Sequence, residues 1–212
     1  MNKTSNKTSK WNALLFIYLF MLVFVIVFQG VPPLFGFIVS ALNISHAQAG
    51  ALMSLFALPG IFISIPGGIL ADIHGSKKVG VASVGITFIG SLISGLAYSF
   101  PVLLTGRIIA GIGALTISIV APQVLSQRFE KKDLGIAMGI FHTTMPLGTI
   151  LTLNLYGRLA TSWGWKMPIF LSTAYVLAIL VLLWFKFPSV PVHNEESTKH
   201  QPAKNLFSIR GA

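Results

Sequence analysis

Long apolar runs, separated by short polar segments, constrain this chain more than any other feature of its sequence. The clearest boundary is residues 68–78 (GILADIHGSKK), where a carboxylate, a glycine and two lysines follow a long and almost unbroken apolar stretch. A helix that crosses a bilayer needs about 20 mostly apolar residues. The sequence is 54% hydrophobic and 9% charged, whereas soluble domains carry about 25% charged residues. We therefore expect an all-α membrane protein.

The runs predict six transmembrane helices within one domain, residues 12–187. Their expected ranges are about 12–42, 47–71, 79–98, 101–127, 134–158 and 167–187. Prolines predict a bend in the first span at residues 32–33, and breaks in the second span at residues 59–60 and 66–68. Residues 1–11 and 188–212 are polar, and we expect them to form an N-terminal and a C-terminal tail.

The distribution of positive charge predicts which ends of these spans face the cytoplasm. Among the 15 Lys and Arg residues, only Arg158 and Lys166 fall at the expected outer ends, and only Arg107 lies inside a span. Cytoplasmic loops are enriched in Lys and Arg, so both termini are expected to be cytoplasmic in a multi-pass protein of the cell membrane. Because the cations cluster at span ends, the net charge of +10 reflects topology and does not indicate nucleic-acid binding.

A weak internal repeat relates the two halves of the chain. Residues 68–77 follow the pattern G-x-L-A-x-x-x-G-x-K, and the same pattern begins again at Gly157, an offset of 89 residues from Gly68. Three spans separate the copies, so the second would be inverted in the membrane relative to the first. A 3+3 inverted repeat is typical of secondary transporters. Chance similarity between two glycine-rich helix ends is the alternative.

At these positions the sequence resembles the N-terminal six-helix half of a major facilitator superfamily transporter. Residues 68–78 match the signature loop of that family between its helices 2 and 3. Residues 106–114 (GRIIAGIGA) resemble its helix 4 motif, and residues 163–166 (WGWK) fit the segment before its helix 6. The resemblance covers about residues 12–187 and implies half of a twelve-helix fold, with residues 188–212 resembling the central linker.

Two departures from the family pattern concern charge and transport mode. Ile73 and Ser76 stand where the family often has arginines. Residues 135–149 match the helix 5 motif of the family's antiporters only in part, so both symport and antiport stay open.

Arg107 is the first candidate for a solute-binding or coupling residue. A cation at membrane depth costs about 2.5–3.5 kcal/mol to insert, and such residues commonly face a cavity or a partner. Gly111 and Ser118 continue its helical face and would line a pathway. Arg107 also matches the arginine of the family's helix 4 motif. The alternatives are that Arg107 reaches the outer interface or only ties helices together.

Gln29 and His142 are the other candidates within the spans. Gln29 is a lone amide just before a proline break, where freed carbonyls would also be available to a solute. His142 is titratable near neutral pH and would suit a proton relay. For both residues, a hydrogen bond between helices is the structural alternative.

The charged turn is the expected conformational switch. The resemblance implies that Gly68, Asp72, Gly75, Lys77 and Lys78 brace one helix against the second half of a transporter. We expect Asp72 to meet a helix N-terminus or Arg128. A turn that only sets membrane orientation is the alternative.

The sequence therefore predicts a secondary active transporter, or its N-terminal half, that moves a small solute by alternating access. Arg107 has no carboxylate partner within the spans, which favours an anionic solute. The alternative is a truncated or partner-dependent six-helix protein that is inactive alone and pairs with a second six-helix chain or as a homodimer. No enzyme motif is found, and we expect no cofactor and no metal.

Overall fold

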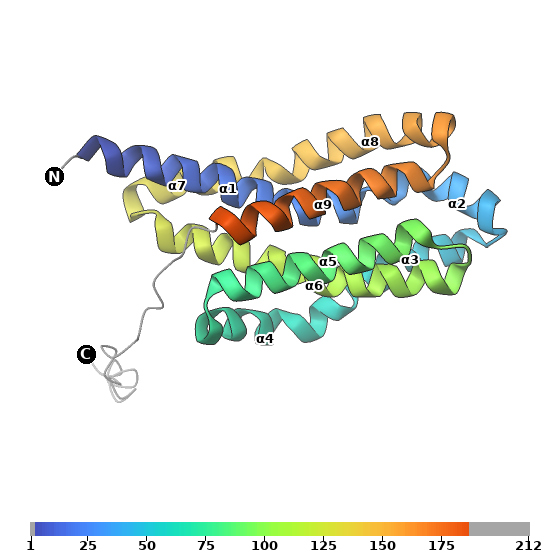
Figure 1. The fold of residues 1–212 in the computed structure, drawn as a ribbon, viewed down its shortest axis with the longest axis horizontal. Helices are drawn as coiled ribbons and strands as arrows, with labels where there is room; N and C mark the ends of the chain where they lie inside the picture. The colour runs from blue at the N-terminus through green and yellow to red at the C-terminus, as the bar shows by residue number, and fades with distance from the viewer. Residues whose placement is uncertain (1–2, 187–212) are drawn as a thin grey trace, which may run out of the picture.

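The protein is a bundle of helices aligned along one axis (Figure 1). The computed structural model describes the backbone of residues 3–186, and the side chains of residues 10–64 and 66–185. The helices in this part of the chain are α1 Lys3–Gln29, the 3-10 turn η1 Pro32–Leu34, α2 Phe35–Leu42, α3 His46–Ala57, α4 Pro59–His74, α5 Ser76–Leu96, α6 Phe100–Arg128, α7 Lys131–His142, α8 Thr144–Trp163 and α9 Lys166–Lys186. No strand occurs among these residues, so the all-α prediction is confirmed.

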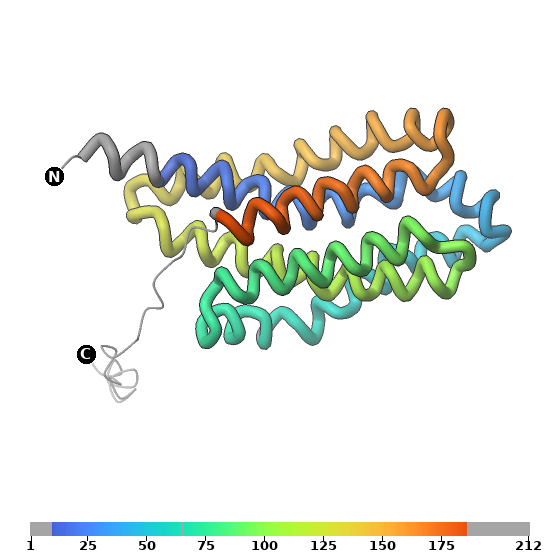
Figure 2. Tube along the Cα trace, viewed as in Figure 1, coloured from blue at the N-terminus to red at the C-terminus, as the bar shows by residue number. Residues whose placement is uncertain are grey.

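Six segments are long and apolar enough to cross a membrane, as the sequence predicts. They are Lys10–Leu42, His46–Ser64, Ser76–Leu96, Phe100–Arg128, Lys131–Trp163 and Lys166–Phe185. Successive spans run back and forth along the long axis (Figure 2). Helix α1 already begins at Lys3, so the described part of the expected N-terminal tail is helical, whereas the apolar span begins at Lys10. The expected tail at 188–212 lies outside the described residues.

Proline explains most of the breaks within the spans. The first span is interrupted after Gln29 by η1, and the second ends α3 at Ala57 and starts α4 at Pro59, both as expected. Pro66 lies inside α4, so the second break expected in that span is wrong. Membrane helices tolerate proline because neighbouring groups can satisfy the freed carbonyl.

The fifth span contains a break that the sequence analysis did not predict. Helix α7 ends at His142 and α8 begins at Thr144. Pro146 has no N–H to donate to the carbonyl of His142, four residues earlier, so an uninterrupted helix would leave that carbonyl without its usual bond. The second and fifth spans are therefore both built from two helices.

The structure supports the 3+3 repeat at the two helix ends that the sequence relates. Gly75 joins α4 to α5 with a φ of 84°, and Gly164 ends α8 before α9 with a φ of 83°. No other glycine of the described residues has a positive φ. Helices α5 and α9, which follow these glycines, each contain 21 residues. The second and fifth spans therefore both contain a break and both end at such a glycine.

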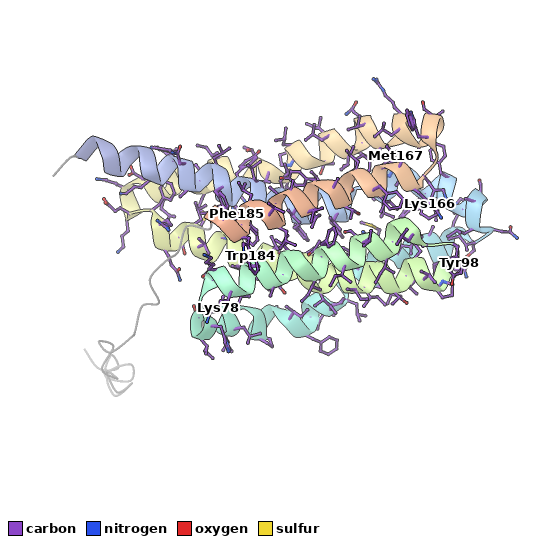
Figure 3. All side chains as sticks on the ribbon, in the orientation of Figure 1. Lys78, Tyr98, Lys166, Met167, Trp184 and Phe185 are labelled. Atoms are coloured by element: carbon purple, nitrogen blue, oxygen red, sulfur yellow. The ribbon has the colours of Figure 1, made fainter. Side chains whose placement is uncertain are left out.

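Charged and aromatic side chains mark the two ends of the bundle. Lys78 lies at the end where the described part of α1 begins, whereas Tyr98 and Lys166 lie at the opposite end (Figure 3). Trp163 ends α8 and Trp184 lies in the last turn of α9, and these side chains are 71% and 70% exposed. Tyr and Trp are enriched at membrane interfaces, so these residues fit the two edges of a bilayer.

Small residues bring α5 and α6 into close contact. A Cβ atom added at Gly90 would lie 2.1 Å from the backbone nitrogen of Ala110, and one at Gly113 would lie 2.2 Å from the carbonyl oxygen of Ser83. Such contacts let helix backbones approach in lipid, where packing rather than water exclusion drives helix association. This pair holds α6, and therefore Arg107, near the bundle centre.

The close contact makes Gly90→Ala destabilising. The added methyl group would force α5 and α6 apart, at a cost of about 1–3 kcal/mol, and should lower the melting temperature in detergent by several degrees. Gly85→Ala is the matched control on the same helix, because a Cβ there meets nothing within 4 Å. Equal melting temperatures for the two variants would contradict the packing of α5 against α6.

Candidate functional site

Arg107 is buried at the meeting point of three helices. Its side chain is 3% exposed. The guanidinium donates from Nη1 to the Val27 carbonyl of α1 at 2.7 Å and, more weakly, from Nε to the Leu52 carbonyl of α3 at 3.5 Å. Its Cζ lies 4.2 Å from the ring centroid of Phe56. The arginine therefore ties α1, α3 and α6 together.

The break after α1 provides the strongest of these contacts. The last four carbonyls of a helix have no partner within that helix, and Val27 lies two residues before the end of α1. The negative end of the helix dipole also favours a cation there. Arg107 therefore satisfies a carbonyl that the proline break releases.

Carbonyl oxygens and an aromatic face surround the cation where a carboxylate would usually be found. Within the described residues the carboxylates are Asp72, Glu130 and Asp133, which all lie near helix ends. Met53 adds its sulfur, 3.8 Å from Nη2. Burying a charge costs solvation free energy unless the charge is paired or hydrogen-bonded. Here peptide dipoles and hydrogen bonds offset that desolvation.

Gly111 and Ser118 have different surroundings. A Cβ atom added at Gly111 would lie 2.2 Å from the carbonyl oxygen of Phe56, so this glycine allows α3 to approach α6. Ser118 is half-buried and donates to the Leu115 carbonyl of its own helix at 2.7 Å. The expected pathway face on α6 is thus a helix-packing face over Arg107 and Gly111.

A second group of polar residues joins α1 to the broken fifth span. Gln29 donates to the Thr149 hydroxyl at 3.1 Å, and the hydroxyls of Tyr18 and Thr143 are 3.1 Å apart. We call these four residues the polar seam. Tyr18, Gln29 and Thr149 are half-buried and Thr143 is exposed, unlike Arg107.

The two remaining candidates of the spans are thus separated from Arg107. Gln29 is a member of the seam, and the exposed His142 lies next to Thr143 and packs edge-on against Phe141, with ring centroids 5.5 Å apart. Sequence reasoning placed Thr143 beside His142 but missed Tyr18 and Thr149. The available signal was Pro146, which places a helix break, and therefore accessible polar groups, beside them.

The expected switch loop contains a single residue between helices. Asp72 lies in the last turn of α4, Gly75 separates α4 from α5, and the exposed Lys77 and Lys78 lie in the first turn of α5. Asp72 accepts a hydrogen bond of 2.5 Å from Gln123 of α6, whereas the sequence analysis expected Arg128 or a helix N-terminus. Arg128 ends the same helix, five residues further on. A Cβ at Gly68 would meet nothing within 4 Å.

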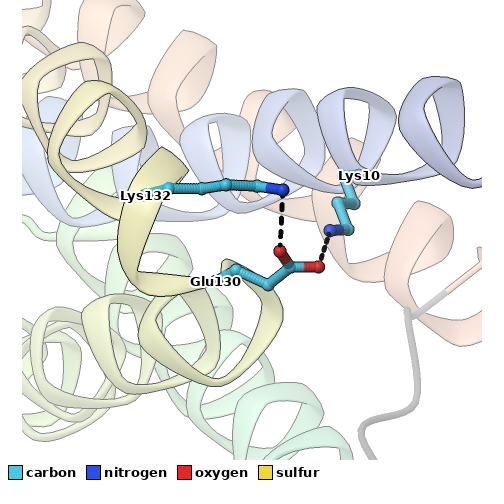
Figure 4. Close-up of polar contacts among 3 residues, drawn as sticks. All are labelled: Lys10, Glu130 and Lys132. Atoms are coloured by element: carbon cyan, nitrogen blue, oxygen red, sulfur yellow. Dashed lines mark hydrogen bonds and ion pairs between the residues drawn. The ribbon is translucent and has the colours of Figure 1, made fainter.

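An ion-pair cluster joins α1 to the turn between α6 and α7. Glu130 accepts from Lys10 at 2.9 Å and from Lys132 at 3.1 Å (Figure 4). The Trp11 and Phe129 rings beside it meet edge to face, with centroids 5.7 Å apart. The hydrogen bond from Lys10, followed by that from Lys132, lowers the pKa of the Glu130 carboxyl.

The six spans, the two related glycine caps and the buried intramembrane cation define a polytopic helical protein of the transporter type. The sequence matches the family model of the Major Facilitator Superfamily over residues 5–211. The chain belongs to this superfamily, which is a family of transporters.

Individual relatives agree with that family, and a solved structure shares the fold. The chain is 25% identical over 194 residues to the hexuronate transporter of Bacillus subtilis, covering 92% of this chain and 45% of that protein. It is 26% identical over 178 residues to the probable galactarate/D-glucarate transporter GarP of Escherichia coli, covering 81% and 39%. A bacterial homologue of the lysosomal transporter Spinster, solved inward-facing and unoccupied, shares the fold with a TM-score of 0.78 and 20% identity, covering 92% and 47%. The chain spans about half the length of these proteins.

The cluster at Glu130 makes a small part of the stability depend on pH. Because folding lowers the pKa of Glu130, its contribution is fully present above the unfolded-state pKa of about 4.3. That contribution is lost as the pH falls through the lower folded-state value. We expect Glu130→Gln to decrease the melting temperature slightly at pH 7, and the difference from the unmodified protein to disappear in strong acid.

Two lysine variants separate the link between helices from local charge. Lys10→Gln should reproduce the effect of Glu130→Gln, because Lys10 is the partner on α1. Lys132→Gln should have a smaller effect, because it leaves that link in place. A larger loss for Lys132→Gln than for Lys10→Gln would refute this role of the cluster.

Proposed function

We propose that this chain is a six-helix half of a secondary transporter for a small anionic solute of the sugar-acid class. The observation that carries the proposal is an intramembrane arginine with no carboxylate near it among the described residues. Two of the relatives are a hexuronate transporter and a probable galactarate/D-glucarate transporter, whose named solutes are sugar acids. A chain with this charge and these relatives is suited to carboxylate solutes.

Arg107 would act on the solute in two ways: through its electric field, and by keeping α1 in place through the Val27 carbonyl. The guanidinium is buried in this conformation, so its N–H groups are not accessible for a bidentate contact with a ligand. Charges interact much more strongly across a low-dielectric interior than in water. An uncompensated positive charge at membrane depth would therefore favour an anion in an adjoining cavity.

The polar seam would provide direct contacts. Gln29, Tyr18, Thr143 and Thr149 are hydrogen-bonded across α1 and the fifth span and remain partly accessible. Amides and hydroxyls are suited to the hydroxyl groups of a sugar acid. His142 lies beside the seam and is the proposed coupling residue if protons drive transport.

Alternating access would come from rocking of this unit against a second six-helix unit. The chain spans about half the length of its relatives, so the second unit would be a further segment, another chain or a second copy. The lysine-rich end would face the cytoplasm in the cell membrane, as the bias of positive charge indicates. The Asp72–Gln123 contact and Gly75 would act as the brace that opens and closes at that end.

A second candidate function is that of a partner-dependent membrane protein with no transport activity alone. The observation that favours it is the exposure of large apolar residues on the second and fifth spans, such as Phe62 at 71% and Ile150 at 59%. Transport that appears only when a second six-helix chain is present would select this alternative. Transport by the purified chain alone would exclude it.

Uptake of labelled glucuronate into proteoliposomes tests the proposed solute. We expect Arg107→Met to decrease uptake by about tenfold or more, equivalent to about 1.4 kcal/mol in the transition state. Arg107→Lys should retain part of the activity, because it keeps the charge but loses the planar fork. Arg158→Gln is the control, because this exposed cation lies near the opposite end of α8 from the seam.

Competition by unlabelled solutes distinguishes charge from sugar recognition. Galactarate should compete for glucuronate uptake, and glucose should not. Equal competition by glucose, or full uptake by Arg107→Met in a folded variant, would contradict the anionic-solute proposal.

A further inference from the structure

A small cavity lies behind Arg107, inside the six-helix bundle. Its volume is about 20 Å³, and it is lined by residues of α1, α5, α6, α8 and α9 together with Gly30 and Val31. The polar residues around it are Ser91, Ser94, Arg107, Tyr156 and Ser172. The cavity is distinct from the polar seam, since none of the four seam residues lines it.

Ser91 has a hydroxyl without a protein partner at this cavity. The side chain is 3% exposed, and its Oγ has no hydrogen-bond partner among the described residues. Buried polar groups are nearly always hydrogen-bonded, either to protein or to ordered water. The other buried serines of α5 with bonded hydroxyls, Ser83 and Ser94, donate to the carbonyls of Val79 and Gly90 at 2.6 and 2.9 Å. Ser91 therefore stands apart from its neighbours on the helix.

The remaining groups offer both donors and acceptors. Ser172 donates to the Pro168 carbonyl at 3.0 Å, so the 2.6 Å contact with Tyr156 uses the tyrosine proton. The oxygens of Tyr156 and Ser94 keep free lone pairs. Arg107 has five N–H donors, and three of its contacts are assigned, to Val27, Leu52 and Met53.

We propose that this cavity binds one ordered water molecule, which bridges Ser91 and Arg107 to the hydroxyl oxygens on the opposite wall. A buried water needs about 10–15 Å³ and two to four polar partners, and the cavity satisfies both conditions. Water both donates and accepts, which matches the mixed lining. A halide ion accepts only, and it would meet the lone pairs of Ser94 and Tyr156 unfavourably.

The bound water gives the buried cation a further hydrogen-bond partner on the side that faces α5, α8 and α9. It also connects α5 and α6 to the Tyr156–Ser172 pair of α8 and α9. The site belongs to the bundle itself and does not depend on the identity of the transported solute.

The sign of the change in melting temperature for Ser91→Ala tests this proposal. A dry, unpartnered hydroxyl would be costly, and its removal would stabilise the protein. If the hydroxyl binds water, its removal instead deletes a hydrogen bond and leaves the water with one partner fewer. Relative to the matched control Ser83→Ala, we expect Ser91→Ala to melt about 2–4 °C lower. A melting temperature above that of the control would overturn the proposal.

Two measurements on the unmodified protein complete the test. A high-resolution structure of the lipid-embedded protein should contain one density peak within hydrogen-bond distance of Ser91 Oγ, and no such peak would overturn the proposal. Replacing chloride by methanesulfonate, an anion outside the sugar-acid class, should leave the melting temperature unchanged. A decrease that follows the chloride concentration would assign the site to an anion and refute the water.

Discussion

The contact between Arg107 and the broken end of α1 is the interaction on which the centre of this bundle depends. The proline break ends α1 at Gln29 and frees the Val27 carbonyl, which accepts from the guanidinium at 2.7 Å. The ring of Phe56 and the Leu52 carbonyl complete the surroundings on α3. The desolvation of this intramembrane cation is thereby offset by dipoles and hydrogen bonds, and not by a buried ion pair.

Close backbone packing makes this arrangement possible. The carbonyl of Phe56 reaches the backbone of α6 only because Gly111 has no side chain, and α5 approaches α6 through Gly90 and Gly113. These contacts join α3, α5 and α6 as one unit. The second and fifth spans are each built from two helices and expose more of their surface, and α3 is the part of the second span that these contacts hold to the centre.

Sequence reasoning predicted the six spans and the repeat, because hydrophobic length and charge bias depend directly on the bilayer. It also predicted the break at Pro32–Pro33 and that Arg107 would avoid lipid. It did not predict that Arg107 and Gln29 lie in separate environments, because the partners of Arg107 on α1 and α3 are 80 and 55 residues away. The break at Thr143 was missed because Pro146 acts on a carbonyl four residues earlier. Pro66 shows the opposite case, a proline that the helix accommodates.

The most direct test of this account is the distance between Arg107 and Val27 in the lipid-embedded protein. Solid-state NMR on protein with labelled arginine nitrogens and labelled valine carbonyl carbons would measure the dipolar coupling between them. A measurable coupling between Arg107 and Val27 is expected, because the guanidinium nitrogen lies 2.7 Å from the oxygen of the labelled carbonyl. A guanidinium that shows no such coupling, and instead contacts bulk water or lipid headgroups, would contradict this account.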